Sequence, residues 1–449
     1  MSNYKISTPK SFKNVHVTVS VPGSKSITNR ALIVAALSDG PCILKGCQFS
    51  DDSKNFINCL KQLGFRLKER GTDVTVYGCG GRIPEKKAGI YVGSAGTAAR
   101  FLTAMLAVSD GEYEVNCSEQ MKKRPMAPLF DALRSMGAEI SCLEKEGHLP
   151  VRIIGRGHCD TSSEKIDINV DITESSQFLS ALLIVAPLLG KNVKIGLTGS
   201  HGLKYADMTV AMMESFGVKA VRNNGNYIIN PGTYSAEEYR IEPDVSAAAY
   251  FYSLAALTGC SVTVENVTLP SLQGDVKLLD ILKKMGCDCT TCVEQPDSTN
   301  NINNVIVKGP TDSEGYPLKL KGGFTADLSE FSDQALTLAV LAAYADSPIT
   351  ITGIAHIKKQ ESDRINSITE NLSTLGIKTE SGEDYVTIYP GETHGGEIQT
   401  FEDHRVAMAF SLAGLKTPGV TILDKECCGK TFKEYFEVFD EVLNTIRQE

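Results

Sequence analysis

The sequence predicts an α/β protein of two domains, built from six copies of one unit that contains two helices and several strands. Two observations predict this fold class. Five amphipathic helical segments end at a glycine that a β-rich run follows: Gly64, Gly137, Gly217, Gly286 and Gly376. A helix of small and apolar residues opens 40 to 43 residues before each of these glycines. Simple alternation of helices and strands would not keep so regular a spacing, so we infer an internal repeat.

The opening helices share a Ser or Asp at the position expected for a helix N-cap, where a side-chain oxygen accepts from free N–H groups. These residues are Ser24, Ser94, Ser175, Asp244, Asp333 and Asp403. In five of the six units, a glycine after the second helix suits the left-handed conformation that closes many helices. The sixth unit ends in "FKEYFEVFDEVLNTI" at the C-terminus, and the division into two sets of three falls near "YRIEPDVS".

Composition limits the classes of protein that the chain can belong to. Its 449 residues are too many for one ordinary core, and 42% hydrophobic with 22% charged residues is typical of globular proteins. A net charge of −9 argues against nucleic acid or a membrane surface as a partner. "MSNYKISTPKSF" lacks a signal-peptide pattern, and "FLSALLIVAPLLG" is too short to span a bilayer, so we expect a cytoplasmic protein.

Neither a metal nor a nucleotide cofactor is expected. Thirteen cysteines without a secretion signal are typical of reduced thiols, and Cys287, Cys289 and Cys292 are too closely spaced and too few for a closed metal site. "CCGKTF" fails the P-loop pattern because Asp424 occupies the place of its first glycine. "GCGGRI" fails the dinucleotide pattern because it ends in Ile83.

Several helix starts carry side chains that suit anions. Ser26 and Arg30 are four residues apart and share a helix face, with Lys25 beside them. Because helix N-termini are partly positive, this group predicts a phosphate or carboxylate site; a solvated basic turn is the alternative. For Asp244, simple capping is the better interpretation.

The other helix starts offer complementary groups. Gly96 lets backbone approach a ligand closely, and the "ESSQ" stretch offers hydrogen bonds to hydroxyl groups and phosphate. Glu361 and Arg364 are three residues apart on one face. Further candidates at such junctions are Ser175, Ser176, Gln177, Arg124, His404, Arg405 and Lys430.

The motifs "PGSKSITNRAL", "GSAGTAARFL", "KRPM", "SSQFLSALL", "QESDRI", "EDHRVAM" and "GKTF" together resemble the 5-enolpyruvylshikimate-3-phosphate synthase family of enolpyruvyl transferases. The resemblance covers essentially the whole chain, in order. It implies a two-domain inverted β/α barrel-like fold with three βαβαββ units per domain. It also implies a first domain of residues 21–241, a second of residues 1–20 plus 242–449, and an active site in the cleft between them.

The resemblance implies an activity as well. The family transfers the enolpyruvyl (1-carboxyvinyl) group of phosphoenolpyruvate to the 5-hydroxyl of shikimate 3-phosphate. A tetrahedral intermediate expels phosphate, on the route to chorismate and aromatic amino acids. The family uses no metal or organic cofactor, and we expect a monomer whose partners are these two small molecules.

The resemblance also assigns roles to residues. Asp333 is the implied base at the hydroxyl, and Glu361 with Lys25 is implied to move protons at the enolpyruvyl carbon. The implied contacts of shikimate 3-phosphate are Lys25, Ser26, Arg30, Ser175, Ser176, Gln177, Tyr205, Asp333 and Gln360. Those of phosphoenolpyruvate are Lys25, Gly96, Arg124, Gln177, Arg364, Arg405 and Lys430, with Ser94, Thr97, Lys359 and His404 as further candidates.

Three positions depart from the family pattern. Gln360 stands where the family often has lysine, so that either Gln360 or a neighbouring lysine, Lys358 or Lys359, takes that role. Gly202 replaces a common serine, for which Ser200 or His201 could compensate, and Ser94 replaces the more usual asparagine. These departures bear on affinity rather than on reaction type.

Two alternatives to this function stay open from the sequence. One is a UDP-N-acetylglucosamine 1-carboxyvinyltransferase, which uses a cysteine as an acid; Cys117 lies just before "MKKRPM". The other is a non-catalytic anion-binding paralogue. Because Gly96 leaves space where a methyl group would intrude, we also expect inhibition by glyphosate in competition with phosphoenolpyruvate.

Overall fold

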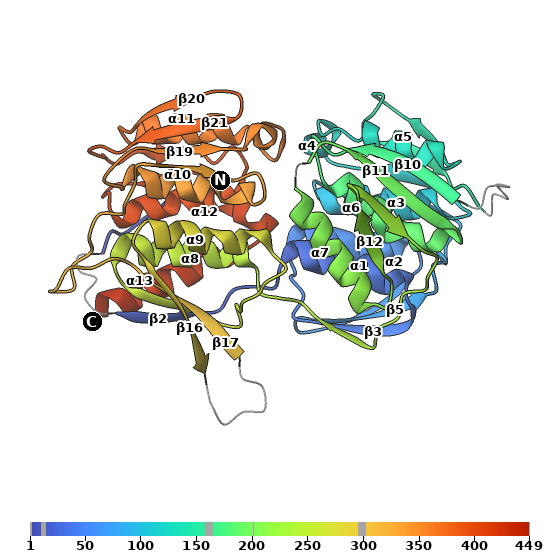
Figure 1. Ribbon diagram of the computed structural model, residues 1–449, viewed down its shortest axis with the longest axis horizontal. Helices are drawn as coiled ribbons and strands as arrows, with labels where there is room; N and C mark the ends of the chain where they lie inside the picture. Colours follow the sequence, from blue (N-terminus) through green and yellow to red (C-terminus); the bar gives the residue numbers. More distant parts are fainter. Residues whose placement is uncertain (1, 10–14, 158–164, 201, 295–301, 449) are drawn as a thin grey trace. The chain divides into compact units, whose positions relative to one another are not determined.

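The computed structural model describes residues 2–9, 15–157, 165–200, 202–294 and 302–448 (Figure 1). The chain forms two compact units. Residues 23–241 make the continuous unit, and residues 1–22 together with 242–449 make the split unit.

In its described part, the continuous unit contains three four-stranded sheets with the orders β14-β3-β5-β4, β6-β7-β9-β8 and β10-β11-β13-β12. One pair in each sheet is parallel and the other pairs are antiparallel. The strands are β3 (Asp39–Lys45), β4 (Arg66–Arg70), β5 (Asp73–Cys79), β6 (Lys87–Tyr91), β7 (Glu112–Asn116), β8 (Glu139–Cys142), β9 (Val151–Ile154), β10 (Lys165–Asp171), β11 (Asn192–Thr198), β12 (Ala220–Asn223), β13 (Asn226–Ile229) and β14 (Glu238–Arg240). Because β14 pairs with β3, the last strand of the unit completes its first sheet.

Helices of two kinds accompany these sheets. Three are apolar on nearly all sides and lie in the core: α1 (Lys25–Leu37), α3 (Gly96–Ala107) and α6 (Gln177–Val185). Every residue of α3 is buried, which explains its run of small apolar side chains. The others are α2 (Asp51–Gln62), α4 (Glu119–Lys122), α5 (Ala127–Ser135) and α7 (Leu203–Ser215), with the 3-10 helix η1 (Ala186–Leu189).

The described part of the split unit repeats this plan with sheets of order β16-β17-β15-β2, β18-β19-β21-β20 and β1-β23-β22. Its strands are β1 (Tyr4–Lys5), β2 (His16–Val19), β15 (Ser261–Val264), β16 (Asp288–Glu294), β17 (Ile302–Lys308), β18 (Phe324–Asp327), β19 (Ile349–Thr352), β20 (Lys378–Ser381), β21 (Tyr385–Tyr389), β22 (Glu397–Ile398) and β23 (Thr421–Ile422). Strand β2 runs parallel to β15, with Val17 opposite Val262. Residues from near the N-terminus thus complete a sheet formed mainly by the C-terminal half.

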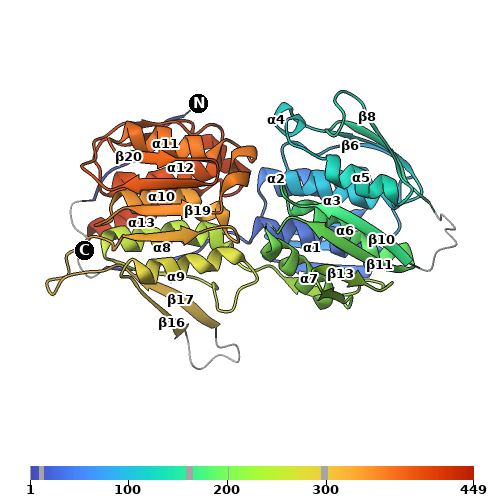
Figure 2. The ribbon, with the colours of Figure 1, turned by 45° about the horizontal axis from the view of Figure 1, so that its top comes forward.

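The helices of the split unit divide in the same way. Helices α8 (Val245–Thr258), α10 (Ala335–Ala343) and α12 (His404–Ser411) are buried along their whole length. Along the chain they alternate with α9 (Leu278–Lys284), α11 (Arg364–Thr374) and α13 (Tyr435–Gln448). Figure 2 labels all six helices. The 3-10 helices are η2 (Gly274–Lys277), η3 (Ser332–Gln334), η4 (Ala355–Lys359), η5 (Leu412–Leu415) and η6 (Lys425–Lys430).

The predicted repeat is confirmed. The order strand, helix, strand, helix, strand, strand is complete in β18-α10-β19-α11-β20-β21 and in β10-α6-β11-α7-β12-β13. All five glycines predicted to close helices have φ between 86° and 100°, in the left-handed region where a Cβ is strained: Gly64, Gly137, Gly217, Gly286 and Gly376.

The predicted N-caps are only partly correct. Asp244 accepts from Ala247 N at 3.1 Å, and Asp403 accepts from Arg405 N at 3.0 Å. Ser24 occupies an N-cap but makes no capping bond. The predictions for Ser94 and Ser175 are wrong by one residue, because Ala95 and Ser176 are the N-caps, and the prediction for Asp333 is wrong because this residue lies within η3. In these three cases the turn before the helix extends further than the sequence pattern indicates.

Three other predictions concern features of the whole chain. No helix in the described ranges has the length and apolar character needed to cross a bilayer. The cysteines that the structure describes are free thiols. No grouping of His, Cys, Asp or Glu suited to a metal occurs among the described residues, and the Cys292 side chain lies outside them.

Candidate active site

In the split unit, Arg364 is the centre of a cluster of charged side chains. Asp363 caps α11 by accepting from Asn366 N at 3.1 Å, so the helix begins at Arg364. Only 1% of the Arg364 side chain is exposed. A guanidinium so deeply buried requires acceptors for its N–H groups.

Carboxylates supply most of these acceptors. Arg364 donates from Nε to Asp403 Oδ2 at 2.8 Å, from Nη1 to Asp333 Oδ1 at 2.9 Å and from Nη2 to Glu361 Oε2 at 3.0 Å. Burial lowers the pKa of Arg364, but the carboxylates of Asp403, Glu361 and Asp333 raise it above its usual value. The guanidinium therefore stays charged and holds three acidic side chains together.

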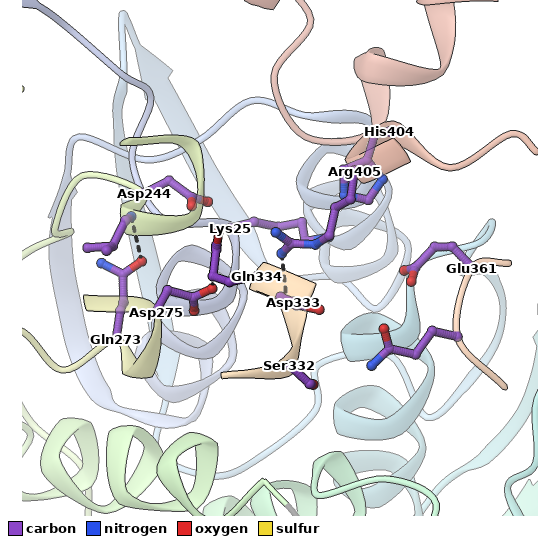
Figure 3. Close-up of polar contacts among 12 residues, drawn as sticks. Lys25, Asp244, Gln273, Asp275, Ser332, Asp333, Gln334, Glu361, His404 and Arg405 are labelled. Carbon is purple, nitrogen blue, oxygen red and sulfur yellow. Dashed lines mark hydrogen bonds and ion pairs between the residues drawn. The ribbon is translucent and has the colours of Figure 1, made fainter. Parts of the chain in front are cut away.

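Asp333 connects Arg364 to a second arginine. Its Oδ2 accepts from Arg405 Nη2 at 2.8 Å (Figure 3). Its Oδ1 accepts from Arg364 Nη1. Arg405 is placed by the first turn of α12, where Asp403 caps the helix and also binds Arg364. Asp333 thus fixes both arginines that the resemblance implies as contacts of phosphoenolpyruvate.

Lys430 completes the cluster on the side of Glu361. Its Nζ lies 3.6 Å from Glu361 Oε1, an ion pair longer than a hydrogen bond. The ammonium is buried and makes no hydrogen bond with the described residues. Three cations therefore meet three carboxylates here, and Lys430 keeps its donors for another acceptor.

The structure gives a partial answer about the position of Gln360. Its Oε1 accepts from Arg364 Nη1, so this amide belongs to the cluster. Lys358 is half-buried and Lys359 is exposed, on the preceding turn η4. The His404 side chain is buried, with Nδ1 at 3.8 Å from Asp403 Oδ1.

In the continuous unit, the predicted residues lie at the starts of α1, α3, α6 and α7. Lys25, the first residue of α1, has its Nζ 3.5 Å from Asp52 Oδ2. Asp52 is buried on α2, so it can hold the lysine in place. Ser26 is half-buried on the same turn.

Arg30 joins three helices of this unit. Its Nε donates to Thr209 Oγ1 at 2.8 Å, and its Nη2 lies 3.3 Å from Ser180 Oγ and from the Tyr205 carbonyl oxygen. Its Nη1 donates to the Ser26 carbonyl at 2.9 Å. Burial lowers the pKa of Arg30 to about 10. Arg30 was predicted as a ligand contact, and the structure also gives it a place in the packing of α1 against α6 and α7.

Gly96, at the start of α3, lies against two arginines. A Cβ at this position would be 2.8 Å from Arg124 Nη1 and 2.9 Å from Arg100 Nη1. The structure thus brings together Gly96 and Arg124, which the sequence placed 28 residues apart. Beside them, Thr97 Oγ1 accepts from Asn29 Nδ2 at 2.7 Å, which joins α3 to α1, and Ser94 is half-buried.

Gly202 is the N-cap of α7 and lies against the start of α6. It has φ +65°, and a Cβ there would lie 2.6 Å from Ser176 Oγ. A serine at residue 202 would therefore be strained in this backbone conformation and would have to displace the Ser176 hydroxyl. Ser200 is exposed, and His201 lies outside the described residues.

Gln177 has an unsatisfied acceptor. Its side-chain Oε1 is buried and has no hydrogen-bond partner in the described ranges, while its backbone N donates to Ser175 Oγ at 3.3 Å. A buried amide oxygen without a donor is costly unless a ligand or water supplies one. This favours the predicted role of Gln177 as a substrate contact.

The sequence reasoning missed several residues of the cluster. Asp403 was noted only as a helix cap, yet it makes two bonds to Arg364. His356 Nε2 lies 2.7 Å from Ser332 Oγ, next to Asp333. No local signal marks such pairs, because each joins segments that are far apart in the sequence.

A buried acid also supports the turn that carries Asp333. Asp275, on η2, accepts from Gln334 Nε2 at 2.8 Å and is 5% exposed (Figure 3). Burial raises the pKa of Asp275 to about 6, and the carboxylate of Asp333 contributes to the rise. The folded protein thus binds this proton more tightly than the unfolded chain does.

Stability should therefore depend on pH through Asp275. Because its folded pKa is above the unfolded value of about 3.9, its contribution to the free energy of unfolding is present below pH about 4 and is lost as the pH rises through about 6. The loss is roughly 3 kcal/mol. Asp275→Asn should abolish this slope in urea unfolding measured across the range, whereas Asp280→Asn, an exposed acid on α9, should keep it. An unchanged slope in Asp275→Asn would contradict the assignment.

Comparison with known proteins identifies the family. The family model described as EPSP synthase (3-phosphoshikimate 1-carboxyvinyltransferase) matches residues 9–439. The chain belongs to this family. As a member it is a transferase of aromatic amino acid biosynthesis, and its family activity moves a 1-carboxyvinyl group to 3-phosphoshikimate.

Relatives in the family match along nearly the whole chain. A 3-phosphoshikimate 1-carboxyvinyltransferase of Nostoc punctiforme is 38% identical over 443 residues, which cover 98% of this chain and 99% of the relative. A chloroplastic member of the family from Solanum lycopersicum is 37% identical, over 96% of this chain and 83% of its own.

Solved structures agree in fold with the family. The EPSP synthase of Acinetobacter baumannii superimposes with a TM-score of 0.79 at 26% identity, covering 98% of each chain. The enolpyruvyl transferase NikO of Streptomyces tendae has a TM-score of 0.68 at 14% identity, covers 96% of each chain and shows the fold alone. The predicted inverted β/α fold and the predicted family are thus confirmed.

The comparisons also bear on the alternatives from the sequence. The matching family is the synthase rather than the nucleotide-sugar transferase. Cys117, the candidate acid of the nucleotide-sugar transferase, is 7% exposed, and burial raises its pKa to about 11. A thiol of this kind gives up its proton reluctantly.

Proposed function

We propose that the chain performs the family reaction, enolpyruvyl transfer from phosphoenolpyruvate to the 5-hydroxyl of shikimate 3-phosphate, with the charged cluster around Arg364 as its chemical centre. The observation that carries the proposal is the chain of ion pairs from Arg405 through Asp333, Arg364 and Glu361 to Lys430. Such a chain offers cations for an anionic substrate and carboxylates that can exchange protons.

The addition step needs two proton transfers, and the elimination step needs a third. Asp333 takes the proton of the 5-hydroxyl as its oxygen bonds to C2 of phosphoenolpyruvate, and Glu361 or Lys25 gives a proton to the methylene carbon. The resulting tetrahedral intermediate loses phosphate by cleavage of the C2–O bond. The group that gave its proton, Glu361 or Lys25, then takes a proton back from the methyl group and the double bond returns. A positioned acid or base contributes about 10²–10⁴-fold to such steps.

The arginines of the cluster prepare Asp333 for this role. Arg364 and Arg405 each donate to one of its oxygens, which favours the carboxylate form. A planar guanidinium suits the carboxylate of phosphoenolpyruvate equally well. When the substrate takes up part of these bonds, the basicity of Asp333 rises where the hydroxyl proton must be accepted.

The continuous unit supplies the remaining groups of the proposal. Lys25 and Arg124 serve the phosphate of phosphoenolpyruvate, and Ser176 with Gln177 serves shikimate 3-phosphate. The buried unpaired oxygen of Gln177 supports this assignment.

A phosphate-release assay tests the proposal. Release is expected only when phosphoenolpyruvate and shikimate 3-phosphate are both present, and omission of either substrate should reduce it to background. Release with UDP-N-acetylglucosamine but not with shikimate 3-phosphate, or no release at all, would overturn the proposal.

Gly96→Ala should weaken binding of phosphoenolpyruvate. The new methyl group would lie 2.8 to 3.0 Å from nitrogens of Arg124 and Arg100, so these guanidinium groups must move by a few tenths of an ångström. Because they are the far ends of flexible side chains, the fold should survive. We expect KM for phosphoenolpyruvate to rise about tenfold, by analogy with the loss of one charge-assisted hydrogen bond. Inhibition by glyphosate should weaken by a larger factor than this.

Gly89→Ala is the matched control for this variant. Gly89 lies on β6, and a Cβ there would have no neighbour within 4 Å. Steady-state kinetics with and without glyphosate should therefore match the wild type. Equal kinetics for Gly96→Ala and the wild type would remove Gly96 from the proposed site.

A further inference from the structure

The three buried helices of the continuous unit end around a hollow of about 970 Å³. Helices α1, α3 and α6 begin at the candidate site residues and end near this hollow, and a helix of twelve residues is about 18 Å long. Loops that follow β5, β9 and β13 complete the lining, together with the turn after η1. The hollow thus belongs to the opposite ends of the helices from those that carry the predicted substrate contacts.

A side-chain cation is not needed to cap these helix ends, because backbone N–H groups already donate to carbonyl oxygens there. Gly80 N donates to Ser38 O at 2.8 Å and Arg156 N donates to Ala107 O at 2.9 Å. In the third repeat, an amide of the loop after β13 makes the corresponding bond to the carbonyl of residue 187, at 3.2 Å. Side-chain cations in this hollow are therefore not explained by capping.

The hollow nevertheless carries an excess of positive charge. Arg82, Arg156 and Lys191 line it, while Lys86 and Asp110 form an ion pair. The Nε and Nη1 atoms of Arg156 are buried, and none of the described residues accepts a hydrogen bond from them. Burying charged N–H groups without an acceptor is costly, so the binding of an acceptor to these two groups would be strongly favoured.

The matching place in the split unit lacks these features. There, the ends of α8, α10 and η5 surround a hollow of about 430 Å³. Two lysines, Lys319 and Lys416, line it with two acids, Asp346 and Glu392, so its charges balance. The positive charge and the unsatisfied guanidinium are thus particular to the continuous unit and do not follow from the repeat.

We propose that the hollow of the continuous unit binds a small organic anion at Arg156. A carboxylate or phosphate group accepts from Nε and Nη1, in the two-bond geometry for which a guanidinium is suited. Leu188 and Leu189 line the same hollow, are half-buried and offer a surface to an apolar body. This site is separate from the transferase chemistry and does not depend on it.

Isothermal titration with benzoate and with phenyl phosphate tests the proposal. We expect saturable binding of at least one of these two compounds, and the one that binds shows whether the site prefers a carboxylate or a phosphate group. Arg156→Ala should bind it at least about tenfold more weakly, as expected for loss of a charge-assisted pair. Arg152→Ala is the matched control, because Arg152 is exposed on β9 and pairs with Glu112. It should bind like the wild type. Arg405→Ala, altered at the transferase site, should also keep this binding.

Glycine amide signals locate the ligand. In ¹⁵N spectra, the signals of Gly81 and Gly157 should shift on titration of the wild type and stay fixed in Arg156→Ala. Turnover of Arg156→Ala without added anion should stay within about twofold of the wild type, which shows that it folds. The proposal would be overturned if Arg156→Ala bound the probes as tightly as the wild type, or if Arg152→Ala lost as much affinity as Arg156→Ala. It would also be overturned if inorganic phosphate bound and neither organic probe did.

Discussion

Asp333→Asn is expected to lower kcat by at least about 100-fold, the lower range for loss of a positioned base. The amide keeps the size of the carboxylate but cannot take the proton of the attacking hydroxyl. Its oxygen can still accept from one arginine, and Arg364 keeps Asp403 and Glu361 as partners. The protein should therefore stay folded, as measured by circular dichroism, while steady-state kinetics with both substrates record the loss.

Asp280→Asn provides the comparison for this variant. Asp280 is exposed on α9 in the same unit, so the change removes one negative charge without touching the cluster. Its kcat should equal that of the wild type. If Asp333→Asn turned over within about threefold of the wild type, Asp333 would not be the base, since one positioned base is worth far more.

Glu361→Gln is expected to have an effect of similar size, at least about 100-fold in kcat. Glu361 links Arg364, at 3.0 Å, to Lys430, at 3.6 Å. The glutamine cannot exchange a proton with the enolpyruvyl carbon, and it also leaves the buried Lys430 without its counter-charge. We expect KM for phosphoenolpyruvate to change much less than kcat, because Lys430 can still bind an anion.

Glu370→Gln separates this effect from general electrostatics. Glu370 is exposed on α11, where it accepts from Asn366 Nδ2 at 2.7 Å. Its kinetics should be those of the wild type. A Glu361→Gln enzyme with unchanged kcat but a large rise in KM would make Glu361 a binding residue rather than a proton carrier.

Much of the fold could be predicted from the sequence because its strongest signals are local. A glycine such as Gly64 is required where the backbone enters the left-handed region after a helix, and this requirement recurs in five of the six repeats. The exact helix starts were harder to predict, since Ala95 rather than Ser94 is the N-cap of α3. Which residue caps a helix depends on the path of the preceding turn, and tertiary contacts determine that path.

The candidate site likewise has residues that the sequence could indicate and contacts that it could not. Residues such as Lys25 and Gln177 stand out because they begin helices, and the family resemblance added roles for them. The partnership of Arg364 with Asp403 joins residues 39 positions apart, and that of Ser332 with His356 joins residues 24 apart. No pattern in either segment specifies its partner, so only the folded chain shows that Arg364 is saturated by acids while Lys430 is not.

The pairing of β2 with β15 has a consequence for synthesis on the ribosome. Strand β2 is made first, but Val17 finds its neighbour Val262 only after the entire continuous unit has emerged. At the usual speeds of translation, on the order of 5–20 residues per second, this delay is roughly 10–50 seconds. During that interval the intervening residues can fold by themselves, whereas the leading segment must wait with its apolar side chains uncovered, a period when a chaperone would be most useful.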